Sequence, residues 1–301
     1  MSDLPTGGPG LCAFPLTPVT RDGVDEGALV ALVSRLAAGG VDSVGVLGST
    51  GVYPYLSRGE RRAAVEAAVD AAGAVPVIAG VGALRTRDTL VHARDAQAAG
   101  ASALLLAPVS YHRLRDEEVA GLYADVAAES SVPIVLYDNP STTAFAFSDE
   151  LSARIAALPL VTGVKVPPPP AGTAADRLAR LRRALPTDVS VGISGDWAAA
   201  EALLAGYDAW YSAFAGLFPR AARAVVQAAT AGDADTADGL SSSLEPIWTL
   251  FRRHGSLRVL AAAAQVLGLV DGPCLPRPLL GLEGTERAEV EAALGASGLT
   301  V

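Results

Sequence analysis

Short apolar runs alternate with helix-like segments along the first two-thirds of the chain, and this alternation restricts the possible folds more than any other feature. Segments such as 57–73, 86–100 and 116–130 show helical spacing and begin near Ser, Thr or Asp. The apolar runs between such segments have the length and continuous hydrophobicity of strands that are covered on both faces. These eight runs are 11–19, 41–48, 75–82, 101–108, 132–138, 161–167, 188–195 and 207–215.

Strands that alternate with helices form parallel sheets with crossover helices, and eight such units close into a (β/α)8 barrel. A doubly wound sheet is the alternative, but no G-x-G-x-x-G motif follows the first run. From residue 219 onward the pattern indicates further helices and no strands. We therefore predict an α/β protein, a TIM barrel over 1–218 with a C-terminal helical extension over 219–301 packed on it.

Charge and hydropathy exclude several classes of partner. The net charge is −9 and the basic residues are not clustered, which argues against nucleic-acid binding. No apolar stretch reaches the length of a membrane span, and the first residues lack the pattern of a secretory signal. Cys12 and Cys274 are far apart in the sequence, so we expect neither disulfides nor a zinc site, and a cytoplasmic location.

Lys165 is the only lysine of the 301 residues, whereas the other 22 of the 23 basic side chains are arginine. A lysine at a strand end can simply extend to water or pair with an acid. Arginine serves those purposes equally well, but it does not lose its proton and attack a carbonyl. Burial between Val164 and Val166 would disfavour the ammonium. We therefore expect a nucleophilic amine that forms a Schiff base with a ketone or aldehyde.

Other polar residues fall at the carboxyl ends of predicted strands, where TIM barrels carry their active sites. Tyr137 ends the strand before that of Lys165 and could supply the proton transfers of imine chemistry, or be a core tyrosine. The turn Gly48–Gly51 (GSTG) offers hydroxyls and backbone N–H groups to a small anion such as a carboxylate, although such residues are also common in ordinary turns. We expect Asp196, in SGDW, to cap a helix.

Together, GSTG after the second strand, Y-x-x-P after the fifth and GVK in the sixth resemble the dihydrodipicolinate synthase / N-acetylneuraminate lyase family. The resemblance covers about residues 10 to 300. It implies a TIM barrel, usually a homotetramer, in which a lysine forms a Schiff base with pyruvate or another 2-keto acid. By this resemblance Lys165 is that lysine and Tyr137 its proton relay.

The remaining site residues also follow from the resemblance. Ser49 joins the relay, and Ser49, Thr50 and Gly51 hold the keto-acid carboxylate. In many relatives a tyrosine from a neighbouring subunit completes the relay. Tyr111, in PVSY after the fourth strand, corresponds to it with an offset of one residue.

The sequence also departs from the family pattern. Synthases of dihydrodipicolinate commonly carry an arginine where this chain has Thr142, and an asparagine where it has Asp138. The arginine grips the carboxylate of the aldehyde partner, so aspartate semialdehyde is a poor fit as second substrate. Prolines occupy all of 167–170, where relatives often carry polar residues and Pro removes a backbone donor.

We therefore predict a lyase that acts on pyruvate or another 2-keto acid through a lysine Schiff base, by aldol cleavage or condensation. One alternative is dehydration of a deoxy-keto sugar acid through the same imine. Another, from a different class, is a barrel that binds a keto acid without turnover. The mechanism requires no cofactor and no metal, and the three histidines lack a metal-ligand spacing. We expect a homo-oligomer, tetramer or dimer, without nucleic-acid or membrane partners.

Overall fold

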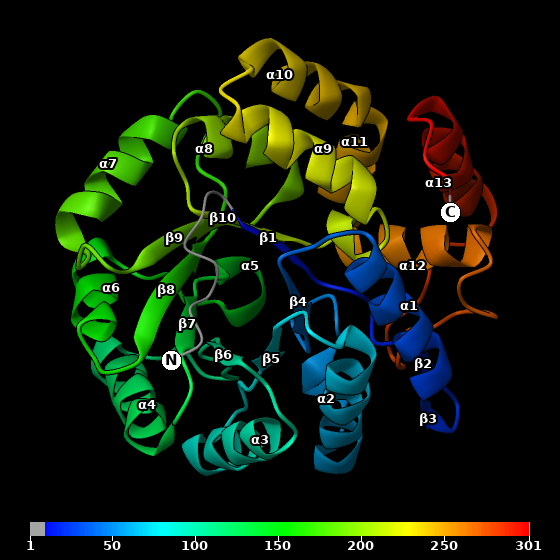
Figure 1. Ribbon diagram of the computed structural model, residues 1–301. Helices are drawn as coiled ribbons and strands as arrows, with labels where there is room; N and C mark the ends of the chain where they lie inside the picture. Colours follow the sequence, from blue (N-terminus) through cyan, green and yellow to red (C-terminus); the bar gives the residue numbers. More distant parts are fainter. Residues whose placement is uncertain (1–9, 301) are drawn as a thin grey trace.

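Eight parallel strands close into a barrel in the computed structural model, which describes residues 10–300 (Figure 1). Each predicted strand is present and somewhat shorter than expected, so the predicted (β/α)8 fold is confirmed. Around the barrel the order is β1-β10-β9-β8-β7-β6-β5-β4, with parallel pairing throughout. The strands are β1 (Gly10–Ala13), β4 (Ser43–Val46), β5 (Val77–Gly80), β6 (Ala103–Leu106), β7 (Ile134–Tyr137), β8 (Val161–Val166), β9 (Ser190–Ile193) and β10 (Ala209–Ser212).

A ring of helices surrounds the strands (Figure 1). The ring consists of α1 (Glu26–Ala38), α2 (Arg58–Ala72), α3 (Thr86–Ala98), α4 (Asp116–Glu129), α6 (Asp149–Ala156), α7 (Ala174–Ala184), α8 (Ala199–Leu204) and α9 (Pro219–Thr230). Shorter helices follow some strands: η1 (Tyr53–Tyr55), α5 (Pro140–Thr143), η2 (Asp196–Ala198) and η3 (Phe214–Gly216). In Figure 1, α5 lies near the centre of the ring, after β7.

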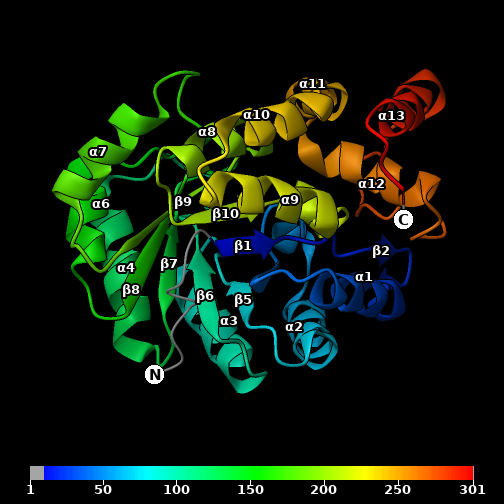
Figure 2. The same cartoon turned by 45° about the horizontal axis from the view of Figure 1, so that its top comes forward.

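Four more helices complete the chain: α10 (Ala234–Ser243), α11 (Glu245–His254), α12 (Ser256–Val266) and α13 (Gly284–Ala296). In Figures 1 and 2, α12 and α13 lie on the side of the barrel next to α1. The helix α9 contacts β1 and α8 and so stands in the ring of barrel helices. The proposed domain boundary after residue 218 would assign α9 to the extension. No helix of the described residues is long and apolar enough to cross a membrane.

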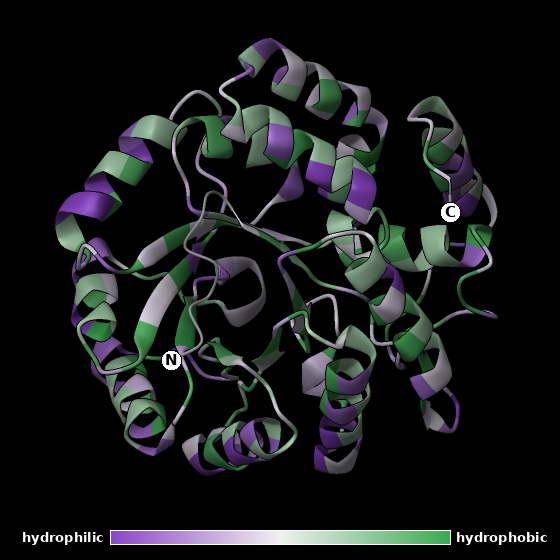
Figure 3. Cartoon of the chain, in the orientation of Figure 1, coloured by the Kyte–Doolittle hydropathy of each residue, from purple (hydrophilic) through white to green (hydrophobic). Residues whose placement is uncertain are grey.

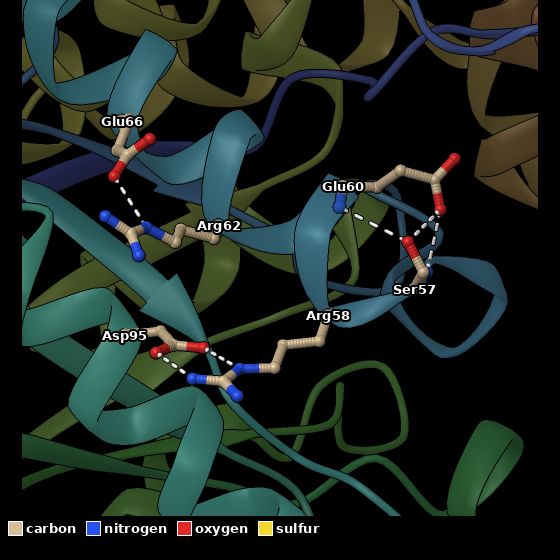
Figure 4. A network of polar contacts seen from close by, with 6 residues as sticks. All are labelled: Ser57, Arg58, Glu60, Arg62, Glu66 and Asp95. Carbon is tan, nitrogen blue, oxygen red and sulfur yellow. Dashed lines mark hydrogen bonds and ion pairs between the residues drawn. The ribbon is translucent and has the colours of Figure 1, made fainter.

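Local signals in the sequence explain where helix α2 begins. Ser57 accepts a hydrogen bond from the backbone of Glu60, whose side chain accepts one from the backbone of Ser57. This capping box satisfies N–H groups that the first turn leaves free. Arg58 then donates two hydrogen bonds to Asp95 of α3, as Figure 4 shows. Because the pair is exposed, it contributes little to stability and mainly fixes neighbouring surface side chains.

Strand residues alternate between two apolar environments. One set faces the surrounding helices and belongs to the main core, for example Leu104 and Leu136. The other set forms a small separate cluster that includes Phe14, Val135, Tyr137 and other side chains of the barrel interior. In Figure 3 the outer faces of the helices are the most hydrophilic parts of the ribbon. Lys165 is therefore exceptional because it is a basic side chain among buried strand residues that are mostly apolar.

The prediction that the first strand covers 11–19 is wrong at the C-terminal end of the strand. Strand β1 stops at Ala13, and the chain then forms a separate antiparallel hairpin of β2 (Val19–Thr20) and β3 (Gly23–Val24). Proline at 15 and 18 lacks the N–H that a continuing strand would use. The hairpin turns at Arg21 and Asp22, and Gly23, which begins β3, has a φ of +124° that favours glycine.

Candidate active site

Lys165 lies inside the barrel and is 4% exposed. It stands in β8, where it is in register with Tyr137 of β7 and with Gly192 of β9. Its Nζ is 4.0 Å from the ring centre of Phe14, 4.0 Å from that of Tyr137 and 5.6 Å from that of Tyr211. Among the ion pairs formed by residues 10–300, none involves Lys165. The amine is thus enclosed by aromatic rings instead of being paired with an acid.

Two effects act on this nitrogen in opposite directions. Burial deprives a charged nitrogen of its hydration. Aromatic ring faces attract a cation, so Phe14 and Tyr137 partly compensate for that loss. A protonated imine on Lys165 would carry the same positive charge as the ammonium. The rings would therefore stabilise such an imine as well.

Tyr137 and Ser49 are brought together, as the sequence predicts for neighbours at one barrel mouth. Tyr137 Oη lies 3.5 Å from Ser49 Oγ, although β7 and β4 are separated by two strands. The ring of Tyr137 is 6% exposed and contacts Lys165, while its hydroxyl is turned toward Ser49. The three side chains form one continuous group of amine, phenol and alcohol.

The turn after β4 presents free backbone donors. Gly51 N donates to Gly48 O and Val52 N to Ser49 O, which closes the turn. Within residues 10–300 the backbone N–H groups of Ser49 and Thr50 have no hydrogen-bond acceptor. Two exposed donors beside hydroxyl groups suit a carboxylate. The turn can therefore hold the anionic end of a small acid.

Steric constraints around this turn explain its glycine. A Cβ on Gly51 would lie 2.8 Å from the backbone N of Leu47, so no side chain fits there. Leu47 and Val52 have left-handed φ values of +56° and +48°. Such values are unusual for branched side chains and concentrate at functional sites. The turn is held in a strained shape by the barrel around it.

Phe14 is a site residue that the reasoning from single motifs missed. Its ring covers Lys165 and packs directly on β4, where a Cβ on Gly45 would lie 2.3 Å from the ring. Gly48 faces the same ring at 2.7 Å. Both glycines leave space for the phenyl group. The sequence placed Phe14 inside the predicted first strand, 11–19, whereas in the structure it follows directly after β1.

Asn139 is a second missed residue. Its Nδ2 lies 2.9 Å from Tyr137 Oη and 3.1 Å from Ser49 Oγ, and donates to both. Asn139 is the only asparagine of the 301 residues, which is the signal that could have drawn attention to it. It ends the loop between β7 and α5, so it reaches the same mouth as the predicted residues.

Tyr111 is placed differently from the other predicted residues. Its side chain is 89% exposed and packs edge-on against His112, with ring centres 5.3 Å apart. Within the described part of the chain it contributes no hydrogen bond to Tyr137 or Ser49. Its role in the relay stays a prediction that depends on a neighbouring copy of the chain.

The expected role of Asp196 as a helix cap is wrong. Asp196 is 4% exposed, and it lies in the first turn of η2 without capping that helix. Its carboxylate accepts hydrogen bonds from Trp210 Nε1, Ser212 Oγ and the backbone N of Phe214. Burial raises the pKa of Asp196 to about 6, against the effect of these hydrogen bonds. These hydrogen bonds connect Asp196, in the loop after β9, to β10 and to the loop that follows β10.

Asp138 follows Tyr137 but faces away from the amine. Its side chain is 6% exposed, and Oδ1 has no hydrogen-bond partner among the described residues. Burial raises the pKa of Asp138 to about 6, while a hydrogen bond from the backbone of Phe147 opposes this shift. The charged form of this carboxyl therefore lowers the stability of the folded protein.

The proline segment after β8 has a defined packing role. Pro168 lies against Gly195, where a Cβ would be 2.6 Å from the proline ring and φ is +88°. The segment thus rests on the loop after β9 and forms one wall near the mouth. Thr142, on α5, is exposed and donates a hydrogen bond to the backbone oxygen of Asn139 at 3.4 Å.

Two cavities of the described residues lie elsewhere. One, of about 320 Å³, is lined by residues of η1, α2 and α3 such as Tyr53, Arg61 and His92. The other, of about 280 Å³, lies among α12, α13 and the loop around Cys274. Residues 10–300 contain no cluster of His, Cys, Asp or Glu side chains that could hold a metal ion.

Comparison with known proteins adds independent information. Residues 9–297 match the Dihydrodipicolinate synthetase family. Among curated proteins, 4-hydroxy-tetrahydrodipicolinate synthase of Azoarcus sp. is 31% identical over 286 residues, which is 94% of this chain and 96% of that protein.

Solved structures agree in fold over almost the entire chain. Dihydrodipicolinate synthase from Agrobacterium tumefaciens is 49% identical, with a TM-score of 0.94 over 98% of this chain and 100% of that one. The dihydrodipicolinate synthase from Acinetobacter baumannii, solved in complex with pyruvate, is 26% identical, with a TM-score of 0.89 over 97% and 99% of the two chains.

Proposed function

Because this chain belongs to the dihydrodipicolinate synthetase family, we propose that it is a lyase that acts on pyruvate or another 2-keto acid through a Schiff base on Lys165. The observation that carries the assignment to Lys165 is its environment. The amine is buried inside the barrel, lies between two aromatic rings and has no acidic partner among the described residues. A lysine that served stability would be paired or would extend into water.

The proposed reaction begins with binding of the acid. The substrate carboxylate accepts hydrogen bonds from the backbone N–H groups of Ser49 and Thr50, with Gly51 keeping the turn compact. The neutral amine of Lys165 then attacks the keto carbon. This attack gives a carbinolamine, and loss of water gives the protonated imine.

The protons balance if Tyr137 is the acid. The carbonyl oxygen leaves as water with one hydrogen from the amine and one from the phenol, so Tyr137 becomes a phenolate. The phenolate then removes a proton from the carbon next to the imine. This step restores the phenol and yields an enamine, which can attack an aldehyde. Ser49, in contact with the phenol, shares the hydrogen during these transfers.

The identity of the second substrate depends on residues at the mouth. Thr142 stands where an arginine would bind a second carboxylate, and the wall at 167–170 consists of proline. These residues favour an aldehyde without a carboxylate near α5. They are also compatible with the alternative reaction, dehydration of a deoxy-keto sugar acid. The exposed Ser141 and Thr142 could bind the hydroxyls of such a substrate.

Two further properties belong to the proposal. A homo-oligomer, tetramer or dimer, would allow the exposed Tyr111 of one copy to reach the site of another. A cytoplasmic location suits the two cysteines, Cys12 and Cys274, which are free and buried.

A substrate screen tests this function. Pyruvate is offered with a panel of aldehydes, with and without a carboxylate, and deoxy-keto sugar acids are offered alone. We expect turnover with at least one of these, and none by the Lys165→Arg variant, which keeps the charge and loses the nucleophile. Turnover by the arginine variant would contradict the mechanism. Binding without turnover would favour the barrel that only binds keto acids.

A further inference from the structure

Asn139 connects the two hydroxyl groups of the site from within the chain. Its Nδ2 donates to Tyr137 Oη at 2.9 Å and to Ser49 Oγ at 3.1 Å. No other side chain of residues 10–300 donates to these oxygens, apart from the contact between them. The one asparagine of the sequence thus lies at the centre of the proposed proton pathway.

The direction of the amide is set by a neighbour. Ser141 Oγ donates to Asn139 Oδ1 at 2.7 Å. Were the amide turned over, its carbonyl would face two hydroxyl groups and its NH₂ group would face Ser141. The observed arrangement uses both hydrogens of the NH₂ group on the oxygens of Tyr137 and Ser49.

The backbone of Asn139 is anchored as firmly as its side chain. Its carbonyl oxygen accepts hydrogen bonds from the backbone N–H groups of Thr142 and Thr143, both at 3.1 Å. Thr143 Oγ1 donates to the same oxygen at 3.0 Å. The adjacent Pro140 begins helix α5 and limits rotation further. The amide is therefore presented from a rigid element.

These contacts determine where the hydroxyl hydrogens can go. Because Asn139 only donates through Nδ2, it occupies a lone pair on each oxygen and leaves both hydroxyl hydrogens available. One hydrogen can bridge the contact of 3.5 Å between Ser49 and Tyr137. If Ser49 supplies that bridge, the phenol hydrogen remains free for the substrate on Lys165.

We infer that Asn139 is a positioning residue that directs the proton of Tyr137 toward the carbinolamine oxygen, which leaves as water, and stabilises the phenolate left behind. This inference rests on the proposed Schiff-base function. Asn139 itself gains and loses no proton.

The test measures imine formation with pyruvate alone. Protein and pyruvate are mixed, quenched with borohydride at increasing times, and the modified fraction is read by mass spectrometry. Asn139→Leu removes the donors, and Asn139→Asp keeps the shape and the partner of Ser141 but offers no NH₂ group. We expect both variants to form the imine about 30- to 300-fold more slowly, near the lower end of the range of acid–base effects.

Controls separate positioning from folding. Gln97→Leu removes an amide of α3 that bonds Ala93 and Ser131 far from the site, so it should lower the melting temperature without slowing imine formation. Affinity for pyruvate should change less than about threefold in the Asn139 variants, because the carboxylate turn is intact.

Two results would overturn the inference. The first is an unchanged rate of imine formation in both Asn139 variants. The second is a loss of pyruvate affinity as large as the loss of rate, which would indicate a distorted pocket. A wild-type protein that traps no pyruvate would instead contradict the proposed function itself, and this inference with it.

Discussion

Lys165 and Phe14 meet inside the barrel although their strands, β8 and β1, are not neighbours, and the lysine Nζ lies 4.0 Å from the centre of the phenyl ring. The ring fits because Gly45 and Gly48 present no side chain to it. A buried cation without an acidic partner is costly, and an aromatic face reduces that cost. This contact connects the packing of the barrel to the chemistry of the amine.

Replacing Phe14 by leucine should affect the equilibrium of imine formation more than it affects the stability of the fold. Relative to the neutral amine, the protonated imine loses the cation–π contribution of one ring, which corresponds to an about 2- to 30-fold lower equilibrium constant for imine formation from that amine. The measurement is the fraction of protein trapped by borohydride against pyruvate concentration. Phe145→Leu, in an aromatic pair with Phe147 away from the amine, is the control and should leave this curve unchanged.

Replacing Tyr137 by phenylalanine should remove the proton donor and keep the ring beside Lys165. We expect imine formation to slow by about two to four orders of magnitude, the usual scale of general acid–base catalysis. Rapid-quench trapping with pyruvate gives the rate. A rate near that of the wild type would mean that Tyr137 is only a packing residue.

Gly45→Ala should test the space for Phe14. The new Cβ would lie 2.3 Å from the ring, so either the ring or the strand must move. We expect a loss of about 1–3 kcal/mol of stability from overpacking and a marked loss of imine formation. Gly121→Ala is the matched control, because a Cβ there, on helix α4, meets nothing within 4 Å. It should stabilise the protein by about 0.5–1 kcal/mol and leave imine formation unchanged.

Asp138→Asn should alter how stability depends on pH. The pKa of Asp138 is raised from 3.8 to about 6, so between these pH values the folded protein binds more protons than the unfolded chain. Stability therefore falls as the pH rises through this window, and the cost is complete above it. The shift corresponds to about 2–3 kcal/mol.

Denaturant unfolding at pH 4 and pH 8 measures this effect. The asparagine variant should be more stable than the wild type at pH 8 and similar to it at pH 4. Some decline should persist in the variant, because the pKa of Asp196 is also raised to about 6. Equal stability of the two proteins at pH 8 would show that Asp138 is not the cause.

The order and type of the barrel elements could be predicted from the sequence because each unit carries its own pattern. Buried strands are continuous apolar runs, and helices such as α2 begin at a capping box. The first strand was extended too far because the hydrophobicity of 11–19 continues past Ala13, whereas pairing does not. Proline positions, not hydrophobicity, decided that end.

The positions of Lys165, Tyr137 and Ser49 at one mouth of the barrel could be predicted, because each residue lies near the carboxyl end of its strand or in the turn that follows. Contacts between segments that are far apart in the sequence could not be predicted. The partners of Asp196 come from residues 14 to 18 positions later, so a local pattern suggested a cap instead. The direction in which the side chain of Asn139 points depends on the loop geometry after β7, which no periodicity describes.

The most direct test of the central proposal is to locate the product of borohydride trapping. Wild-type protein is incubated with pyruvate and borohydride, digested, and sequenced by mass spectrometry. Since Lys165 is the only lysine, its side chain is the only ε-amine that can react. We predict one reduced pyruvate adduct on the peptide that contains Lys165, and none in Lys165→Arg. Full turnover of substrate without any adduct at Lys165 would contradict the Schiff-base mechanism.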